Sequence, residues 1–240
     1  MTASANPLAV SPSASRPLAA KPLAMGLGVA LAWLASAQAW AQQPASQPPQ
    51  FPDMTFFVTS KPGPNGGDFG GLAGADKHCQ ALATTAGAGA KTWRAYLSTQ
   101  GADAVNARER IGAGPWRNAK GVEIAANVET LHAANRLGLD TSLTETGRKI
   151  AGAGFNNNNH DIFTGSGTDG RALPADKDMT CANWTNGGDG AAMVGHSDRL
   201  GLNDSDAAKS WNASHATRGC APPALATTGG AGFLYCFAAQ

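Results

Sequence analysis

The sequence predicts one globular domain that combines helices and strands and has long ordered loops in its second half. The 240 residues are 42% hydrophobic and 15% charged, which is enough apolar material for one sizeable core. Helix-like and strand-like patterns are concentrated before residue 136 and at the C-terminus. The polar stretch between them is rich in Gly, Asn and Asp but still holds two Cys, two Trp and three of the five His. We therefore expect ordered loops there rather than disorder.

Residues 1–41 predict a secretory signal peptide. Arg16 and Lys21 precede the apolar run PLAMGLGVALAWLASA, and Ala39 and Ala41 supply the small residues that a signal peptidase reads. The apolar run is shorter than the roughly 20 residues needed to span a bilayer, which disfavours a membrane anchor. We expect cleavage near Ala41, with cleavage after Ala39 as the alternative.

The mature chain is expected to begin with a linker over residues 42–52, QQPASQPPQFP, which is rich in Pro and Gln, and to fold over residues 53–240. Removing residues 1–41 takes away two of the 18 Lys and Arg and none of the 17 Asp and Glu, which leaves 16 against 17 and a formal charge of −1. This balance predicts no nucleic-acid partner and no attraction to anionic membranes. After signal cleavage no membrane span is expected, so we expect a secreted or periplasmic protein.

The first elements of the domain follow from local pattern. MTFFVTS at 54–60 is β-branched and aromatic and ends in a Pro/Gly cluster, which predicts a strand. A helix is predicted over 71–87, because glycines flank it and its apolar residues recur at helical spacing, with Cys79 on the buried face.

Later elements are less regular. TWRAYLST at 92–99 alternates in the manner of a half-buried strand, and weaker helical patterns occur at 105–112 and 127–135. From about 136 to 232 turn-forming residues dominate, with short islands such as DIFTG, CANWT and AAMVGH. The last segment, GFLYCFA at 232–238, predicts a strand.

All four cysteines, Cys79, Cys181, Cys220 and Cys236, lie in the mature part of the chain. An even number of cysteines in an exported protein predicts two disulfides. No pair has the C-x-x-C spacing typical of zinc or redox motifs. The residues alone leave three possible pairings.

Several stretches carry a resemblance to known families. GGDFGGLAGADKHCQALATTAGAGAKTWRAYLST resembles the start of the endostatin domain of basement-membrane collagens, and TGSGTDGRAL, CANWT and FLYCF follow in the same order. The chain is also similar to secreted bacterial proteins labelled lectins, which share WRAYLST, NARERIG, MVGH and GGAG..YCFA in register. The resemblance implies an α+β domain with the C-type lectin-like fold, long irregular loops and adjacent terminal strands. It also implies two nested disulfides, Cys79 to Cys236 and Cys181 to Cys220.

By this resemblance the chain is expected to be a secreted lectin-like module that binds carbohydrate through its loop face. The standard calcium motifs are missing, because no Glu-Pro-Asn or Gln-Pro-Asp occurs and Ala213 stands after Trp211-Asn212 where a metal-binding carboxylate is expected. Aromatic rings flanked by amides, imidazoles and carboxylates suit sugars. The candidate ligand-binding residues are Asn183, Trp184, His196, Asp198, Arg199, Trp211, Asn212 and His215. The structural alternative is that both Trp belong to the core and both Asn only cap turns.

No cofactor is expected, with zinc or calcium as the alternatives. His196, Asp198 and His215 are ligand types suited to zinc, and His160 and Asp161 are possible additions. We expect no catalytic residue and no enzyme activity, because Ser166 does not lie in a G-x-S-x-G elbow and no H-E-x-x-H motif occurs. A hydrolase is therefore the less favoured class. The main alternative is a module for protein–protein interaction or adhesion, with an envelope or matrix protein as its partner.

Overall fold

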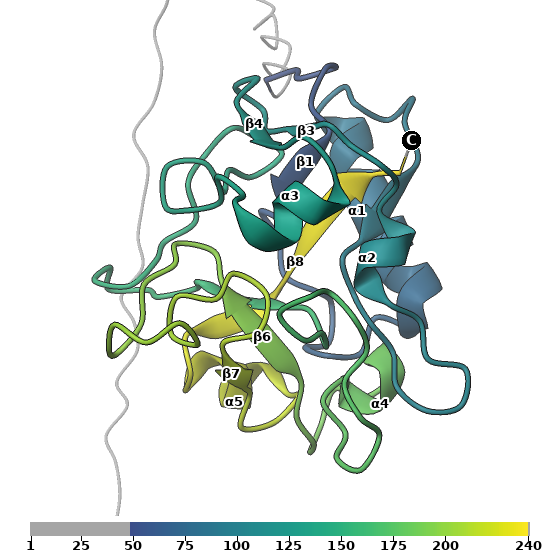
Figure 1. Cartoon of the computed structure of the whole chain (residues 1–240), viewed down its shortest axis with the longest axis vertical. Helices are drawn as coiled ribbons and strands as arrows, with labels where there is room; N and C mark the ends of the chain where they lie inside the picture. Colours follow the sequence, from purple (N-terminus) through teal and green to yellow (C-terminus); the bar gives the residue numbers. More distant parts are fainter. Residues whose placement is uncertain (1–48, 240) are drawn as a thin grey trace, which may run out of the picture. The chain divides into compact units, whose positions relative to one another are not determined.

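The computed structural model describes residues 49–239. The predicted signal peptide and residues 42–48 of the predicted linker lie outside the described residues. Ordered packing begins before residue 53, because the Phe51 backbone N–H donates to the Ala86 carbonyl and its side chain packs against the core. The architecture is α+β, with short helices and strands joined by long loops (Figure 1).

The C-terminal strand β8 (Gly230–Ala238) is the centre of the sheet. It pairs antiparallel with β1 (Phe56–Val58) and β2 (Trp93–Ala95), and parallel with β5 (Asp161–Phe163). The sheet has the order β1-β8-β5-β6-β7, where β6 is Met193–His196 and β7 is His215–Ala216. The first and last strands of the domain are therefore direct neighbours.

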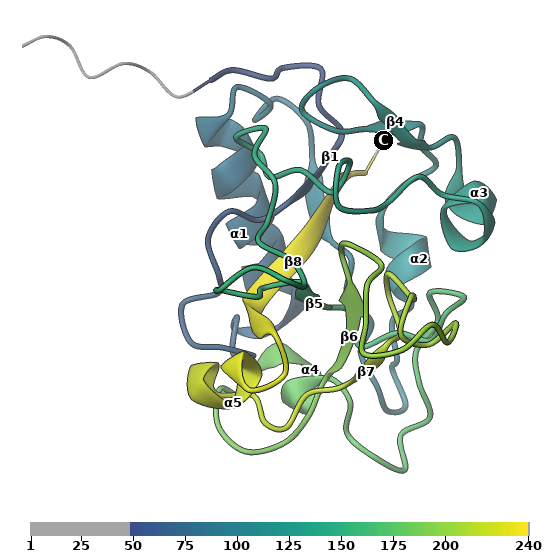
Figure 2. The same ribbon diagram turned by 90° about the vertical axis from the view of Figure 1, so that its left-hand side faces the viewer.

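Both faces of β8 are covered. Leu234, Cys236 and Ala238 contribute to one apolar cluster, and the alternate residues Tyr235 and Phe237 to a second. In Figure 2, helix α1 (Gly71–Thr85) lies on one side of β8, while α3 (Val128–Ala133) and β4 (Glu123–Ala125) lie on the other. This arrangement explains why the last strand reads as a continuous apolar run.

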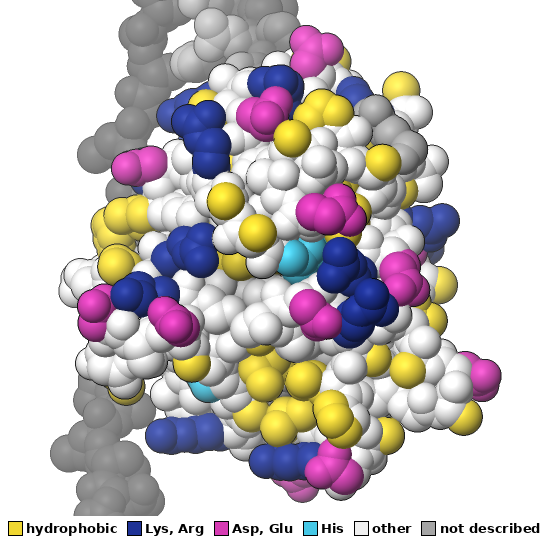
Figure 3. Space-filling model, viewed as in Figure 1, with side chains coloured by type: hydrophobic (Ala, Val, Ile, Leu, Met, Phe, Trp, Pro, Cys, Tyr) yellow, Lys and Arg dark blue, Asp and Glu magenta, His cyan; other side chains and the backbone are white. Residues whose placement is uncertain are grey.

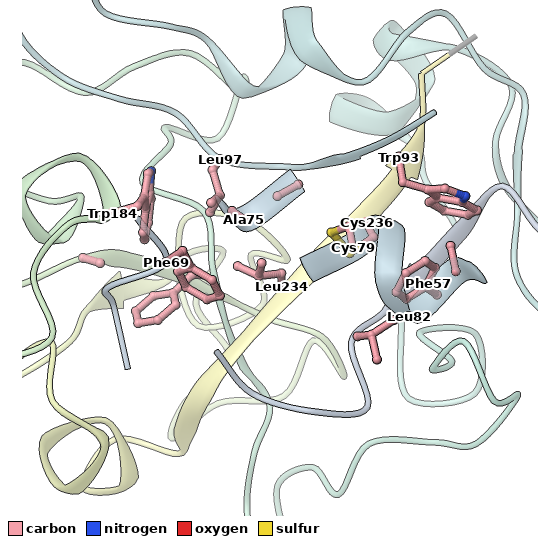
Figure 4. Close-up of a cluster of buried hydrophobic side chains, with 14 of the residues drawn as sticks. Phe57, Phe69, Ala75, Cys79, Leu82, Trp93, Leu97, Trp184, Leu234 and Cys236 are labelled. Carbon is pink, nitrogen blue, oxygen red and sulfur yellow. A yellow bond between two sulfur atoms is a disulfide. The ribbon is translucent and has the colours of Figure 1, made fainter. Parts of the chain in front are cut away.

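The first cluster joins α1 to the sheet. Cys79 and Leu82 point from the helix toward β8, next to Phe57 and Trp93 (Figure 4). The Cys79–Cys236 disulfide crosses this interface with a sequence separation of 157 residues. The predicted helix is confirmed, and its predicted buried face includes Cys79.

The second cluster lies under α2 (Ala107–Arg110), α3 and the hairpin of β3 (Trp116–Arg117) with β4. The two weaker helical patterns are thus confirmed as short helices. The strand predicted over 92–99 is confirmed only at Trp93–Ala95. A half-buried strand would expose Arg94, Tyr96 and Ser98 on its outer face, but Tyr96 is fully buried. The alternation itself continues, because Trp93, Ala95 and Leu97 lie in the first cluster and Tyr96 in the second, where it packs against Trp211 and Phe237. Tyr96 is buried because that face of the strand is covered as well.

The loop half contains more regular structure than predicted. Strands β5, β6 and β7 lie within it, together with the single-turn segments α4 (Cys181–Trp184) and α5 (Pro222–Ala226). All four α4 residues have positive φ between 50° and 68°. The Cys181–Cys220 disulfide, with a separation of 39 residues, joins α4 to the segment before α5. Both disulfides have the nested pairing that the resemblance implies.

The surface carries charges of both signs. On the face shown in Figure 3, basic and acidic side chains are interspersed rather than gathered by sign. Among residues 49–239, no helix is long and apolar enough to cross a membrane. Two disulfides in the described domain fit an oxidising compartment.

Candidate functional site

A buried cluster of imidazoles and carboxylates lies where β5, β6 and β7 meet. In the antiparallel register Asp161 faces His196, and His215 faces Val194. Residues directly opposite in a pair share one face of the sheet, as do residues two apart on one strand. Asp161, His196 and His215 therefore converge on the same face, although they are distant in the sequence.

His160 joins this group from just outside the sheet. Because it precedes the first residue of β5, strand alternation does not fix the side on which it lies. Its ring is stacked on that of His196, with centroids 4.1 Å apart and an interplanar angle of 10°. Both side chains are only 6% exposed.

The Nε2 atoms of the three histidines surround one carboxylate oxygen. Asp161 Oδ1 lies 3.3 Å from His160 Nε2, 3.3 Å from His196 Nε2 and 3.5 Å from His215 Nε2. The ligand atoms of His160, Asp161 and His196 all lie within 4.8 Å of one another. Composition and spacing are those of a group that can hold a metal ion.

The Nδ1 atoms of the same histidines face acceptors on the opposite side of each ring. His160 Nδ1 lies 3.0 Å from Asp198 Oδ1, His196 Nδ1 lies 2.7 Å from the Ala208 carbonyl, and His215 Nδ1 lies 3.1 Å from the Ala216 carbonyl. An acceptor at Nδ1 holds the proton there in a neutral imidazole. The free Nε2 lone pairs are then directed toward Asp161.

Asp161 is a buried carboxylate without a hydrogen bond. Its side chain is 0% exposed, and neither oxygen has a hydrogen-bond partner of acceptable geometry. Burial would raise the pKa of Asp161, but interaction with His196 and His215 outweighs it and holds the pKa below the usual value. The same contact with Asp161 raises the pKa of His215. The carboxylate is therefore favoured in its charged form, and its charge requires a cationic neighbour.

Asp198, unlike Asp161, is well hydrogen-bonded and lies on the Nδ1 side of the His160 ring. It accepts from His160 Nδ1 and from the backbone N–H groups of Ala153 at 2.8 Å and Leu200 at 2.9 Å. Burial would raise the pKa of Asp198, but these hydrogen bonds lower it below its usual value. Asp198 thus orients the His160 ring from outside the cluster instead of facing the Nε2 atoms.

The cluster borders a pocket of about 870 Å³. His160, His196 and His215 form part of its wall. Amides and hydroxyls supply much of the remaining lining, from Asn156, Asn157, Asn158, Asn159, Asn203, Ser205, Ser214, Thr227 and Thr228. Arg218 is the charged residue of the lining, which contains no Asp or Glu.

Two large apolar side chains are exposed along this pocket. Phe155 is 56% exposed, and Leu202 is completely exposed. Phe155 directly precedes the asparagine run, so an aromatic ring and four amides lie in one segment of the lining.

The two predicted ligand-binding tryptophans lie in the core. Trp184 is 0% and Trp211 3% exposed. Trp184 Nε1 donates to the Ser98 carbonyl at 2.8 Å, and the Trp211 ring packs against Tyr96 and Tyr235. A sugar could not stack on either ring without displacing core side chains.

Three of the predicted polar ligands, Asn183, Arg199 and Asn212, also make structural contacts away from the pocket. Asn183 bonds both backbone groups of Gln100, and Asn212 Nδ2 donates to the Tyr96 hydroxyl at 3.0 Å. Arg199 donates to the Lys209 carbonyl and to Asn135. Of the eight predicted residues, the structure brings His196 and His215 into the cluster with His160 and Asp161, and places Asp198 at its edge, bonded to His160 Nδ1. The other five make contacts elsewhere and are not part of the pocket lining.

Residues missed at the sequence level are Phe155, the asparagines that follow it, Arg218, Thr227 and Thr228. The segment GAGFNNNNHD did contain a signal, because it places one aromatic residue beside a run of four amides. No protein-family model matches this chain, and no significant match to a curated protein is found.

Proposed function

We propose that this chain is a secreted binding module with a C-type lectin-like fold of the endostatin type, and that it binds a glycan in the pocket beside Phe155. The observation that carries this proposal is the exposed Phe155 ring next to four pocket-lining asparagines. The sequence resemblance to secreted bacterial lectin-like proteins supports it.

The chemistry of the pocket suits a sugar. The apolar face of a sugar ring stacks on an aromatic side chain, and Phe155 offers such a face to solvent. Each asparagine amide has both donors and an acceptor, so it can pair with hydroxyls that also donate and accept. A volume of about 870 Å³ lies within the range of small-molecule sites.

The lining favours binding over hydrolysis. Glycosidases use a pair of carboxyl groups that flank the scissile bond. The pocket lining contains no Asp or Glu, and the neighbouring Asp161 and Asp198 are engaged in the histidine cluster. We therefore propose that the chain retains its ligand without transforming it.

A glycan array with residues 42–240 tests the proposal through a matched pair of variants. Phe155→Tyr keeps the ring face, while Phe155→Leu keeps apolar bulk and removes the ring. Loss of one stacking contact of about 1 kcal/mol corresponds to roughly a fivefold weaker affinity. We expect the array hit to survive in Phe155→Tyr and to weaken in Phe155→Leu. A blank array with folded protein, or equal binding by both variants, would refute the proposal.

A protein partner is the second candidate. Leu202 is completely exposed along the same pocket as Phe155, and exposed apolar side chains beside polar ones are typical of docking surfaces. A blank array combined with capture of one defined envelope or matrix protein, lost in Leu202→Asp, would favour this function.

A further inference from the structure

We propose that His160, His196, His215 and Asp161 form a site for a divalent transition metal, with Zn²⁺ as the preferred ion. The metal proposal rests on different observations from the glycan proposal, because its ligands come from the strand junction, although the three histidines also line the pocket. It also differs from the calcium motif absent from the sequence, since its donors are three imidazoles and one carboxylate.

The spacing of the donor atoms fits a tetrahedral ion. Zinc lies about 2.0–2.1 Å from nitrogen or carboxylate oxygen, so neighbouring donors at tetrahedral angles are about 3.3–3.4 Å apart. The three distances from Asp161 Oδ1 to histidine Nε2 atoms are 3.3, 3.3 and 3.5 Å. Each histidine Nε2 thus lies as far from the carboxylate oxygen as two ligands of one ion would lie from each other, and His160, Asp161 and His196 form the mutually close part of the group. The same contacts are too long and too poorly aligned for good hydrogen bonds.

Proton positions lead to the same conclusion. Acceptors at all three Nδ1 atoms favour the neutral tautomer with its proton on that side, which leaves each Nε2 able to ligate a metal ion beside a carboxylate that has no hydrogen-bond donor. The Ser214 hydroxyl lies 3.2 Å from His196 Nε2 and can satisfy only one of the Nε2 lone pairs. A metal ion held between these atoms would supply the positive charge that the buried Asp161 carboxylate needs.

The three histidines also make the outer hydrogen bonds that are typical of metal-binding histidines. Ligating histidines donate their other ring nitrogen to a carboxylate or a backbone carbonyl, which fixes the ring orientation. Asp198 has this relation to His160, and the Ala208 and Ala216 carbonyls have it to His196 and His215. Asp198 is accordingly a positioning residue and not a ligand.

The donor set also selects the ion. Calcium takes six to eight oxygen ligands, whereas this group offers three nitrogens and one carboxylate. Imidazole nitrogens with one carboxylate suit zinc among the common divalent ions. The His215 side chain is 35% exposed and lines the pocket, so the ion can enter from that side.

The test uses residues 42–240 without a polyhistidine tag, treated with chelator and dialysed. Zinc affinity and stoichiometry are measured by competition with a chromophoric chelator, and Co²⁺ is added as a spectroscopic probe. We expect one zinc per chain, a rise of the melting temperature with zinc, and the visible absorption of tetrahedral cobalt. Calcium at the same concentration should produce none of these changes.

Variants separate ligands from bystanders. His215→Ala, at the most exposed of the proposed ligands, should fold and weaken zinc binding at least 100-fold. Asp198→Asn should weaken it about 10- to 100-fold while keeping the stoichiometry. His78→Ala is the matched control, because His78 is an imidazole on α1 that contacts the Lys61 carbonyl outside the cluster.

Three results would overturn the proposal. These are no zinc retention by folded wild-type protein, equal loss in His78→Ala and His215→Ala, or an octahedral cobalt spectrum. Zinc binding with a blank glycan array would leave the metal site established and refute only the glycan proposal.

Discussion

The two disulfides provide an internal test of what stabilises this fold, because they close loops of very different length. The outer bond spans 157 residues and the inner bond 39. The chain-entropy model gives about 5 kcal/mol for a loop as long as the outer one and about 4 kcal/mol for the inner one. The Cys79→Ala/Cys236→Ala variant should therefore lose about 1 kcal/mol more stability than Cys181→Ala/Cys220→Ala.

Burial does not confound this comparison. All four cysteines are 0% exposed, so each double variant removes two fully buried sulfurs and the loss of packing is similar. Urea unfolding of both variants and of the wild type gives the free energies of unfolding, with the slope as a check that the unfolded states are comparable. For a domain of this size the difference corresponds to roughly 2–4 °C in melting temperature. Equal losses, or a larger loss in the inner variant at unchanged slope, would refute the loop-entropy reasoning.

Two further predictions concern packing around the sheet. Asp76 is buried and accepts a hydrogen bond from Arg110 Nη2 at 2.7 Å. Asp76→Asn would leave Arg110 without its counter-charge, so it should lower the free energy of unfolding in urea by about 3 kcal/mol. A loss below about 1 kcal/mol would contradict this. Gly195 lies on β6, where an added Cβ would be 1.8 Å from the Trp211 carbonyl oxygen. Gly195→Ala should therefore lower the free energy of unfolding by about 1–3 kcal/mol. It should also weaken zinc binding, because His196 is the next residue on the strand. Gly138→Ala, which meets nothing within 4 Å, is the control and should not lower the melting temperature; equal effects of the two alanines would contradict the steric argument.

Periodic segments were predictable because their pattern repeats along the chain. Helix α1 shows its apolar residues at helical spacing over four turns, and the structure buries Cys79 and Leu82 as expected. Strand β8 is apolar over nearly its whole length, as a strand covered on both faces should be. Long elements give enough positions for a period to be distinguished from chance.

The strands that build the histidine cluster could not be predicted in the same way. Strands β5, β6 and β7 have three, four and two residues, which is too short for an alternation to be recognised. Composition suggested that the loop tryptophans form a ligand surface, yet Trp184 and Trp211 fill the core. An aromatic residue in a polar loop has the same local sequence whether its ring faces inward or outward.

The sequence by itself determined which residue types are present: a polar second half, three histidines within it, and four cysteines able to form two disulfides. Tertiary structure decided which of these residues meet. Only the register of β5 with β6 and of β6 with β7 places Asp161, His196 and His215 on one face, and only the burial of that face separates the Asp161 carboxylate from water without giving it a hydrogen bond. Cross-strand register is set by contacts between distant segments, so no local pattern specifies it.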